Sequence, residues 1–168
     1  MKYLSLAGML IVMLIDAAQA ARSVRTTIDV VAEVNTSVRV YVEGRDVTDG
    51  AIALRLEDKN GYMFGVTPVF QFVGNASAVS LTLNQPANGG LLSENNELMA
   101  INNVWVRGDG AEVSSDYPLH NQPVYPTLEE IPDPQRGVRV RFSSAKRSEA
   151  YPLGTYSGSY EIIVTPSV

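Results

Sequence analysis

The chain has 168 residues, and its 13 Lys and Arg against 18 Asp and Glu give a formal net charge of −5 at pH 7. This acidic balance offers no basic surface, so we expect neither nucleic acid nor an anionic membrane as a partner. The chain has no cysteine and one histidine, which excludes thiolate metal sites, thiol nucleophiles, disulfides and clusters of histidine ligands. We therefore expect no cofactor and no bound metal.

The first 20 residues have the pattern of a secretory signal peptide. Lys2 supplies a positive charge, residues 4–15 are almost entirely apolar, and Ala18-Gln19-Ala20 forms a small-x-small cleavage pattern. The apolar run is shorter than the roughly 20 residues that a bilayer-spanning helix needs. A retained N-terminal anchor is the alternative. We expect residues 1–20 to be removed on export, with Ala21 as the first mature residue.

Period-two alternation of apolar and polar residues, typical of half-buried strands, recurs along the rest of the chain. It predicts strands at residues 23–34, 37–42, 52–56, 65–73, 79–83, 98–107, 111–114, 138–142 and 156–165. Turn-forming pairs such as Asn60-Gly61 separate the strands, and no segment after residue 20 has a helical period. Residues 117–134 hold five of the nine prolines and are predicted to form a long surface loop. The pattern predicts a single all-β sandwich domain.

The first predicted strand is unusually long and has one consistently non-charged face. That face carries Val24, Thr26, Ile28, Val30, Ala32 and Val34. At about 3.3 Å per residue the strand spans roughly 35 Å, long enough to run the length of a sandwich. An immunoglobulin-like sandwich would need one more strand after residues 156–165 to close its sheet edge. We therefore expect such a sandwich without its last strand, completed either by the chain's own N-terminal strand or by that of a neighbour, as in donor-strand complementation.

These two ends of the sequence resemble the pilins of the CS1-type class, the alternate chaperone–usher fimbriae of Gram-negative bacteria. The spacing Val24-x3-Ile28-x-Val30-x-Ala32-x-Val34 is similar to the donor strand of that family, and residues 153–158, Leu-Gly-Thr-Tyr-Ser-Gly, are similar to its C-terminal signature. The lack of cysteine also fits this class. Two departures are Asn35-Thr36, where the family often has Asp-Pro, and the proline-rich loop, which has no counterpart.

The resemblance implies a signal peptide (1–20), an N-terminal donor-strand extension (21–35) and an Ig-like pilin domain (36–168). The donor face would fill the groove of the next subunit, giving a surface fimbria for adhesion and colonisation. A periplasmic chaperone would occupy the groove before assembly, and an outer-membrane usher would exchange the chaperone for the next subunit's donor strand. Further partners would be identical or related pilins, a tip adhesin and, through the fibre, a host receptor. Localisation would be extracellular, after export through the periplasm.

Less specific interpretations accompany these expectations. In the alternative function, a secreted monomeric β-sandwich that binds carbohydrate, the N-terminal strand is an ordinary edge strand of its own domain. Gly154 and Tyr156 are interpreted as a fold motif, with Tyr156 in a tyrosine corner. Trp105 is interpreted as a core residue, and residues 107–109, Arg-Gly-Asp, as a tight turn. The sequence carries no catalytic constellation, and its one histidine, His120, stands in the proline-rich loop, so we expect no enzyme.

Overall fold

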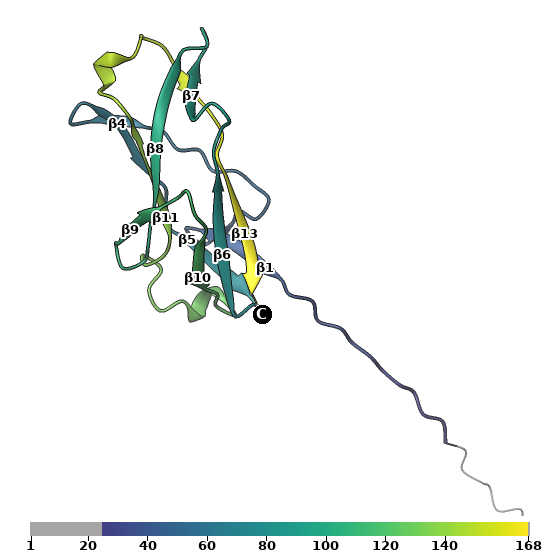
Figure 1. Cartoon of the computed structure of the whole chain (residues 1–168). Helices are drawn as coiled ribbons and strands as arrows, with labels where there is room; N and C mark the ends of the chain where they lie inside the picture. Colours follow the sequence, from purple (N-terminus) through teal and green to yellow (C-terminus); the bar gives the residue numbers. More distant parts are fainter. Residues whose placement is uncertain (1–24, 168) are drawn as a thin grey trace, which may run out of the picture. The chain divides into compact units, whose positions relative to one another are not determined.

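The computed structural model describes residues 25–167 (Figure 1). The predicted signal peptide and Val24 lie outside the described residues. The chain has two units, an N-terminal extension up to Glu33 and a β-sheet domain that begins at Val34. The described part of the extension, together with residues 34–37, has no regular secondary structure and is exposed.

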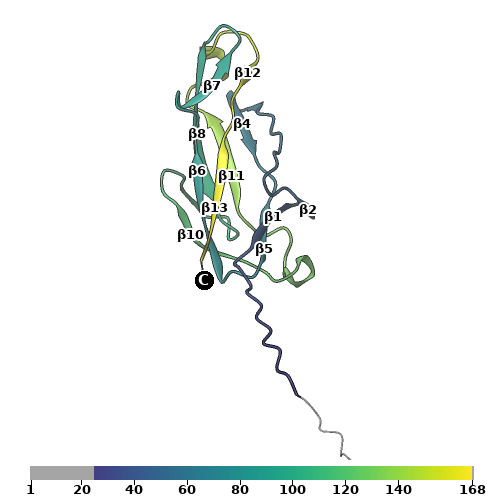
Figure 2. The same ribbon diagram turned by 90° about the vertical axis from the view of Figure 1, so that its right-hand side faces the viewer.

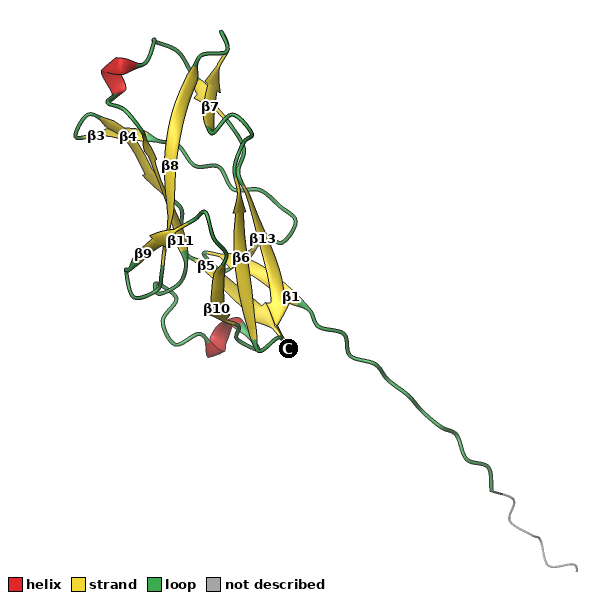
Figure 3. Cartoon of the chain, viewed as in Figure 1, coloured by secondary structure: helices red, strands yellow, loops and turns green. Residues whose placement is uncertain are grey.

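The domain is nearly all-β, with antiparallel strands and two single-turn 3-10 helices (Figure 3). Its strands are β1 (Val38–Val42), β2 (Arg45–Asp46), β3 (Glu57–Lys59), β4 (Tyr62–Val66), β5 (Phe70–Gly74), β6 (Ala78–Asn84), β7 (Gly90–Ser93), β8 (Leu98–Val106), β9 (Glu112–Ser114), β10 (Leu119–Pro123), β11 (Arg139–Ser144), β12 (Tyr156–Ser157) and β13 (Glu161–Ser167). The 3-10 helices are η1 (Leu128–Glu130) and η2 (Ser148–Ala150).

The strands form three hydrogen-bonded groups. The largest has the order β12-β7-β8-β11-β4-β3, with β9 on β8; the others are β10-β6-β13 and β2-β1-β5. In Figure 2, β6 and β13 run alongside each other, and their ladder extends from the Glu161–Asn84 pair to the Ser167–Ala78 pair. These curled antiparallel sheets are consistent with the predicted β-sandwich.

Alternate side chains of the strands face a single hydrophobic core. Along β6, Val79, Leu81 and Leu83 are buried, whereas the residues between them are half-buried, which is the period-two pattern of a strand with one face inward. Trp105 of β8 is fully buried, so its interpretation as a core residue is confirmed. The buried core cluster comprises Val42, Phe70, Phe72, Val79, Leu81, Leu83, Met99, Ile101, Trp105, Leu119, Val138, Val140 and Phe142.

The prediction of a strand at residues 52–56 is wrong. Residues 51–56 have no regular structure, and the ladder with β4 begins only at Glu57. The alternation nevertheless has a structural meaning, because Ile52 and Leu56 are half-buried against the core. The segment thus has the side-chain pattern of a strand, but it pairs with no strand in the described structure.

Three other predictions need correction. The predicted strand at 65–73 is two strands, β4 and β5, separated by residues 67–69. The proline-rich segment is only partly a loop, because β10 pairs with β6 and places Pro123 at the end of an edge strand, where a missing N–H is tolerated. Strand β7, which follows Asn88-Gly89, was not predicted, because its glycine and short length give no alternation to detect.

Candidate functional site

The predicted donor face presents large aliphatic side chains to solvent. Ile28, Val30 and Val34 are 80%, 86% and 83% exposed, and Thr26 and Ala32 between them are also exposed. Val24, the remaining residue of this face, lies outside the described residues. Exposed apolar side chains do not gain the favourable free energy of burial. A row of them along one face of a segment therefore indicates an interaction surface.

The domain carries a groove of about 610 Å³ beside its core, lined mostly by apolar residues. The groove reaches core side chains of several strands, among them Phe70, Leu83, Ile101, Val140 and Phe142. It is also lined by residues 47–52, Leu54 and Leu56, by β1 through Val40, and by residues 158–162 and Val164. Because core side chains form its floor, an occupant of this groove would extend the hydrophobic core rather than sit on the surface.

One rim of the groove is the outer edge of β13. This strand pairs with β6 along its whole length, and it is the last strand of its group, so no described strand pairs with its other edge. Ile162 and Val164 line the groove and pack against the core. An unpaired strand edge offers a row of backbone N–H and C=O groups to another strand, and here that row stands beside an apolar groove.

The opposite rim is the irregular segment 51–56. Ile52, Leu54 and Leu56 all line the groove. The segment belongs to no ladder, and none of the backbone hydrogen bonds in turns and loops of the described structure involves it. The groove is therefore lined by the unpaired outer edge of β13 and by a segment that has no strand partner in the described structure. The alternation of this segment is visible in the sequence, but its contribution to the groove is not.

A small polar network anchors the start of this rim. The Thr48 hydroxyl accepts a hydrogen bond of 2.8 Å from the Val40 N–H, and the Thr48 N–H donates to Asp46 at 2.9 Å. Arg39 forms an ion pair with the other Asp46 oxygen at 2.7 Å. The two hydrogen bonds from Thr48, with the Arg39 guanidinium, lower the pKa of Asp46 from 3.8 to about 2. With Asp46 ionised, the network holds residues 45–48 against β1.

We predict that acid weakens this anchor. The folded-state pKa of Asp46 lies below its unfolded value, so the stability it contributes is present above about pH 3.8 and is lost as the pH falls toward about 2. Asp46→Asn removes the contribution at every pH. The urea midpoint of the wild type should therefore exceed that of Asp46→Asn near neutral pH, and the two midpoints should converge at about pH 2. A difference that stays constant over this range would contradict the assignment.

Gly154 and Tyr156, the predicted fold motif, lie outside the groove. The Tyr156 hydroxyl donates a hydrogen bond of 2.8 Å to the carbonyl oxygen of Pro152, four residues upstream, and its ring packs edge-on against Tyr151. This is the backbone contact that defines a tyrosine corner. The residues therefore shape the chain's entry into β12 and contribute nothing to the groove.

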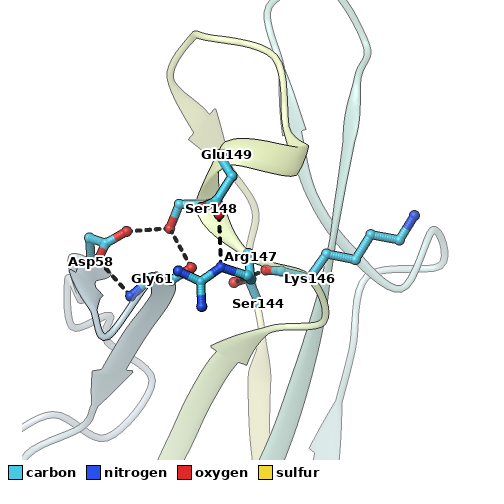
Figure 4. Close-up of polar contacts among 7 residues, drawn as sticks. All are labelled: Asp58, Gly61, Ser144, Lys146, Arg147, Ser148 and Glu149. Atoms are coloured by element: carbon cyan, nitrogen blue, oxygen red, sulfur yellow. Dashed lines mark hydrogen bonds and ion pairs between the residues drawn. The ribbon is translucent and has the colours of Figure 1, made fainter.

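The densest polar cluster joins the β3–β4 turn to the segment after β11 (Figure 4). The Ser148 hydroxyl bonds to Asp58 and to the Gly61 carbonyl oxygen, and the Ser148 N–H donates to that oxygen at 2.7 Å. Arg147 pairs with Glu149 at 2.7 Å. Hydrogen bonds from the Ser148 hydroxyl and the Gly61 N–H lower the pKa of Asp58. The cluster ties the β3–β4 turn to the segment after β11.

The remaining polar candidates also form local contacts. His120 shares a hydrogen bond of 3.0 Å with the Ser80 hydroxyl. In residues 107–110, the Gly110 N–H donates to the Arg107 carbonyl at 2.8 Å and Arg107 pairs with Asp109 at 3.2 Å, which is the tight turn expected there. Among the described residues, no group of three or more acidic or histidine side chains is placed to hold a metal ion.

Comparison with known proteins identifies no relative: no family model matches the chain, and neither does any curated protein. Within residues 25–167, the structure has no helix with the length and apolar character to cross a membrane. The groove and the exposed apolar extension are thus the features from which a function can be argued.

Proposed function

We propose that this protein is a structural pilin: a subunit that polymerises into a surface fimbria by inserting its N-terminal strand into the groove of a neighbour. The observation that carries the proposal is the groove. It is lined by β13, whose outer edge has no strand partner in the described structure, and by segment 51–56, which belongs to no ladder. The same chain carries an exposed, strand-like segment whose apolar face has no partner in the described structure.

The strand connections support an immunoglobulin-like interpretation. β3, β4, β11 and β8 are consecutive neighbours in one sheet, as are the A, B, E and D strands of that fold, while β6 and β13 pair as the C and F strands do. On this assignment the neighbour missing from β13 is strand G. Strand G would lie along the free edge of β13, which is where the groove is found.

The extension has the chemistry required of strand G. Ile28, Val30, Ala32 and Val34 recur at every second residue, so they would all point toward the groove floor while the intervening residues face solvent. Backbone hydrogen bonds to β13 would add affinity without regard to side chains, and the apolar pockets would add specificity. Because the groove floor is the core itself, insertion would complete the fold of the acceptor as it joins the two subunits.

The same geometry implies that other proteins assist the export of the subunit. A subunit whose groove is empty exposes apolar surface and an unpaired strand edge, and both promote aggregation. We propose that a periplasmic chaperone covers the groove until an outer-membrane usher exchanges it for the next subunit's extension. The assembled fibre would then serve adhesion and colonisation, carrying a tip adhesin or contacting a host receptor.

The first test is electrophoresis of cell-surface material that contains this chain, with and without boiling. We expect a ladder of multimers in the unheated sample that collapses to one monomer band after boiling. Strand exchange is non-covalent but kinetically trapped, and the chain has no cysteine to form disulfide-linked multimers. A single monomer band in both lanes would contradict the proposal and favour the secreted carbohydrate-binding sandwich.

A further inference from the structure

Asn75 forms hydrogen bonds with the segment that joins the extension to the rest of the domain. It lies in the turn between β5 and β6, and its side chain accepts a hydrogen bond of 2.7 Å from the Ser37 N–H. Its side-chain amide donates to the Asn35 carbonyl oxygen at 3.0 Å, and its own N–H donates to the Ser37 carbonyl at 3.1 Å. The backbone is therefore fixed on both sides of Thr36.

Gly74, the residue before Asn75, allows this close contact. Gly74 pairs with Val38 in the β1–β5 ladder, and a Cβ at position 74 would collide with the Ser37 carbonyl oxygen. Only glycine allows the root of the extension, residues 35–37, to approach the turn this closely. Gly74 and Asn75 together form a socket for the root.

The socket stands at the end of β13. Ser77, two residues after Asn75, donates from both its N–H and its hydroxyl to the Ser167 carbonyl oxygen, each at 3.0 Å. The root and the last residues of β13 thus flank one turn, and Figures 1 and 2 both show β1 beginning beside the end of β13. A chain that filled its own groove would have to reverse direction within residues 35–37 and run parallel to β13.

We infer that Asn75 is a positioning residue that fixes the root of the extension and thereby prevents a subunit from filling its own groove. Such a reversal would need a tight bend around Thr36, and the three hydrogen bonds of Asn75 restrict the backbone on both sides of that residue. A strand arriving from another subunit meets no such constraint. The inference rests on the proposed function, because it assumes that the extension is the natural occupant of the groove.

The test compares Asn75→Ala with the wild type, both as full mature chains refolded at the same concentration. Loss of two side-chain hydrogen bonds should raise the ratio of compact, heat-sensitive monomer to multimer by roughly 5- to 30-fold. Asn75→Asp retains an acceptor for the Ser37 N–H and should give an intermediate ratio. Asn84→Ala, which removes an exposed asparagine bonded to Glu161 of β13, is the matched control and should leave the ratio unchanged.

A second variant covers the case in which Asn75→Ala folds poorly. Insertion of two glycines after Thr36 loosens the root without altering the β5–β6 turn, and it should also raise the monomer ratio. Ratios equal to the wild type in both variants would overturn the inference.

A labelled peptide of residues 23–34, added during refolding, separates the two hypotheses. Capture of the peptide by the wild type and the variants alike, with unchanged monomer ratios, would reject only the role of Asn75. Failure of the wild type to capture the peptide or to form multimers would reject strand donation itself. The expected result is capture by the wild type, with weaker capture and a raised monomer ratio in Asn75→Ala, because the variant's own extension competes with the peptide for the groove.

Discussion

Under the proposed function, a chain with Ile28→Asp is expected to form no fibre while it is still exported and captured by the proposed chaperone. Ile28 is 80% exposed in the described structure, so the substitution leaves the domain itself intact. Insertion would place a carboxylate in an apolar groove, at a cost of several kcal/mol, and would forfeit about 1.5–3 kcal/mol of isoleucine burial. A total of roughly 4 kcal/mol or more corresponds to about a thousandfold weaker exchange.

The measurement is the multimer ladder of unheated surface material, together with the amount of chain held in the periplasmic chaperone complex. The matched control is Val31→Asp, which introduces the same carboxylate on the opposite face of the extension, at a side chain that is 91% exposed. We expect this control to polymerise. A normal ladder from Ile28→Asp would show that the extension is not the donor, and an equal loss in both variants would show that the face assignment is wrong.

The sequence predicted the strands that have their own alternation, but it could not reveal which strand lies beside which. Residues 52–56 illustrate the limit. Their alternating leucine and isoleucine side chains predict a strand, and Ile52 and Leu56 do pack against the core. A strand also needs a neighbour for its hydrogen bonds. That neighbour is a property of the whole fold. We propose that this segment becomes a strand only when a donor lies next to it.

The candidate site could be predicted from the sequence only in part, again because its contacts depend on the whole fold. The proposed donor face follows directly from residue spacing in one segment, so it can be predicted from the sequence alone. The groove combines side chains from residues as distant as Val40 and Val164, and no local pattern connects them. The hydrogen bonds of Asn75 to residues 35–37 could not be predicted, because they depend on the β1–β5 register.

The second large effect concerns the acceptor side. Leu54→Asp is expected to give a chain that can donate its strand but cannot accept one. Leu54 lines the groove, is 36% exposed and does not belong to the core cluster, so the domain should tolerate the change. A carboxylate on the groove rim would oppose an apolar occupant, as it does when placed on the donor. Leu153→Asp, at a side chain that is 99% exposed and outside the groove, is the control and should polymerise normally.

The combination of the two variants tests the direction of assembly. Ile28→Asp keeps an intact groove, and Leu54→Asp keeps an intact donor, so neither should form multimers alone. Mixed during refolding, they should form a one-to-one heterodimer and nothing larger, because the only free groove and the only free donor left are the defective ones. Head-to-tail assembly through two different surfaces predicts this arrest, whereas a symmetric dimer, in which both copies use the same patch, does not. Longer multimers from the mixture, or none at all, would contradict strand donation between subunits.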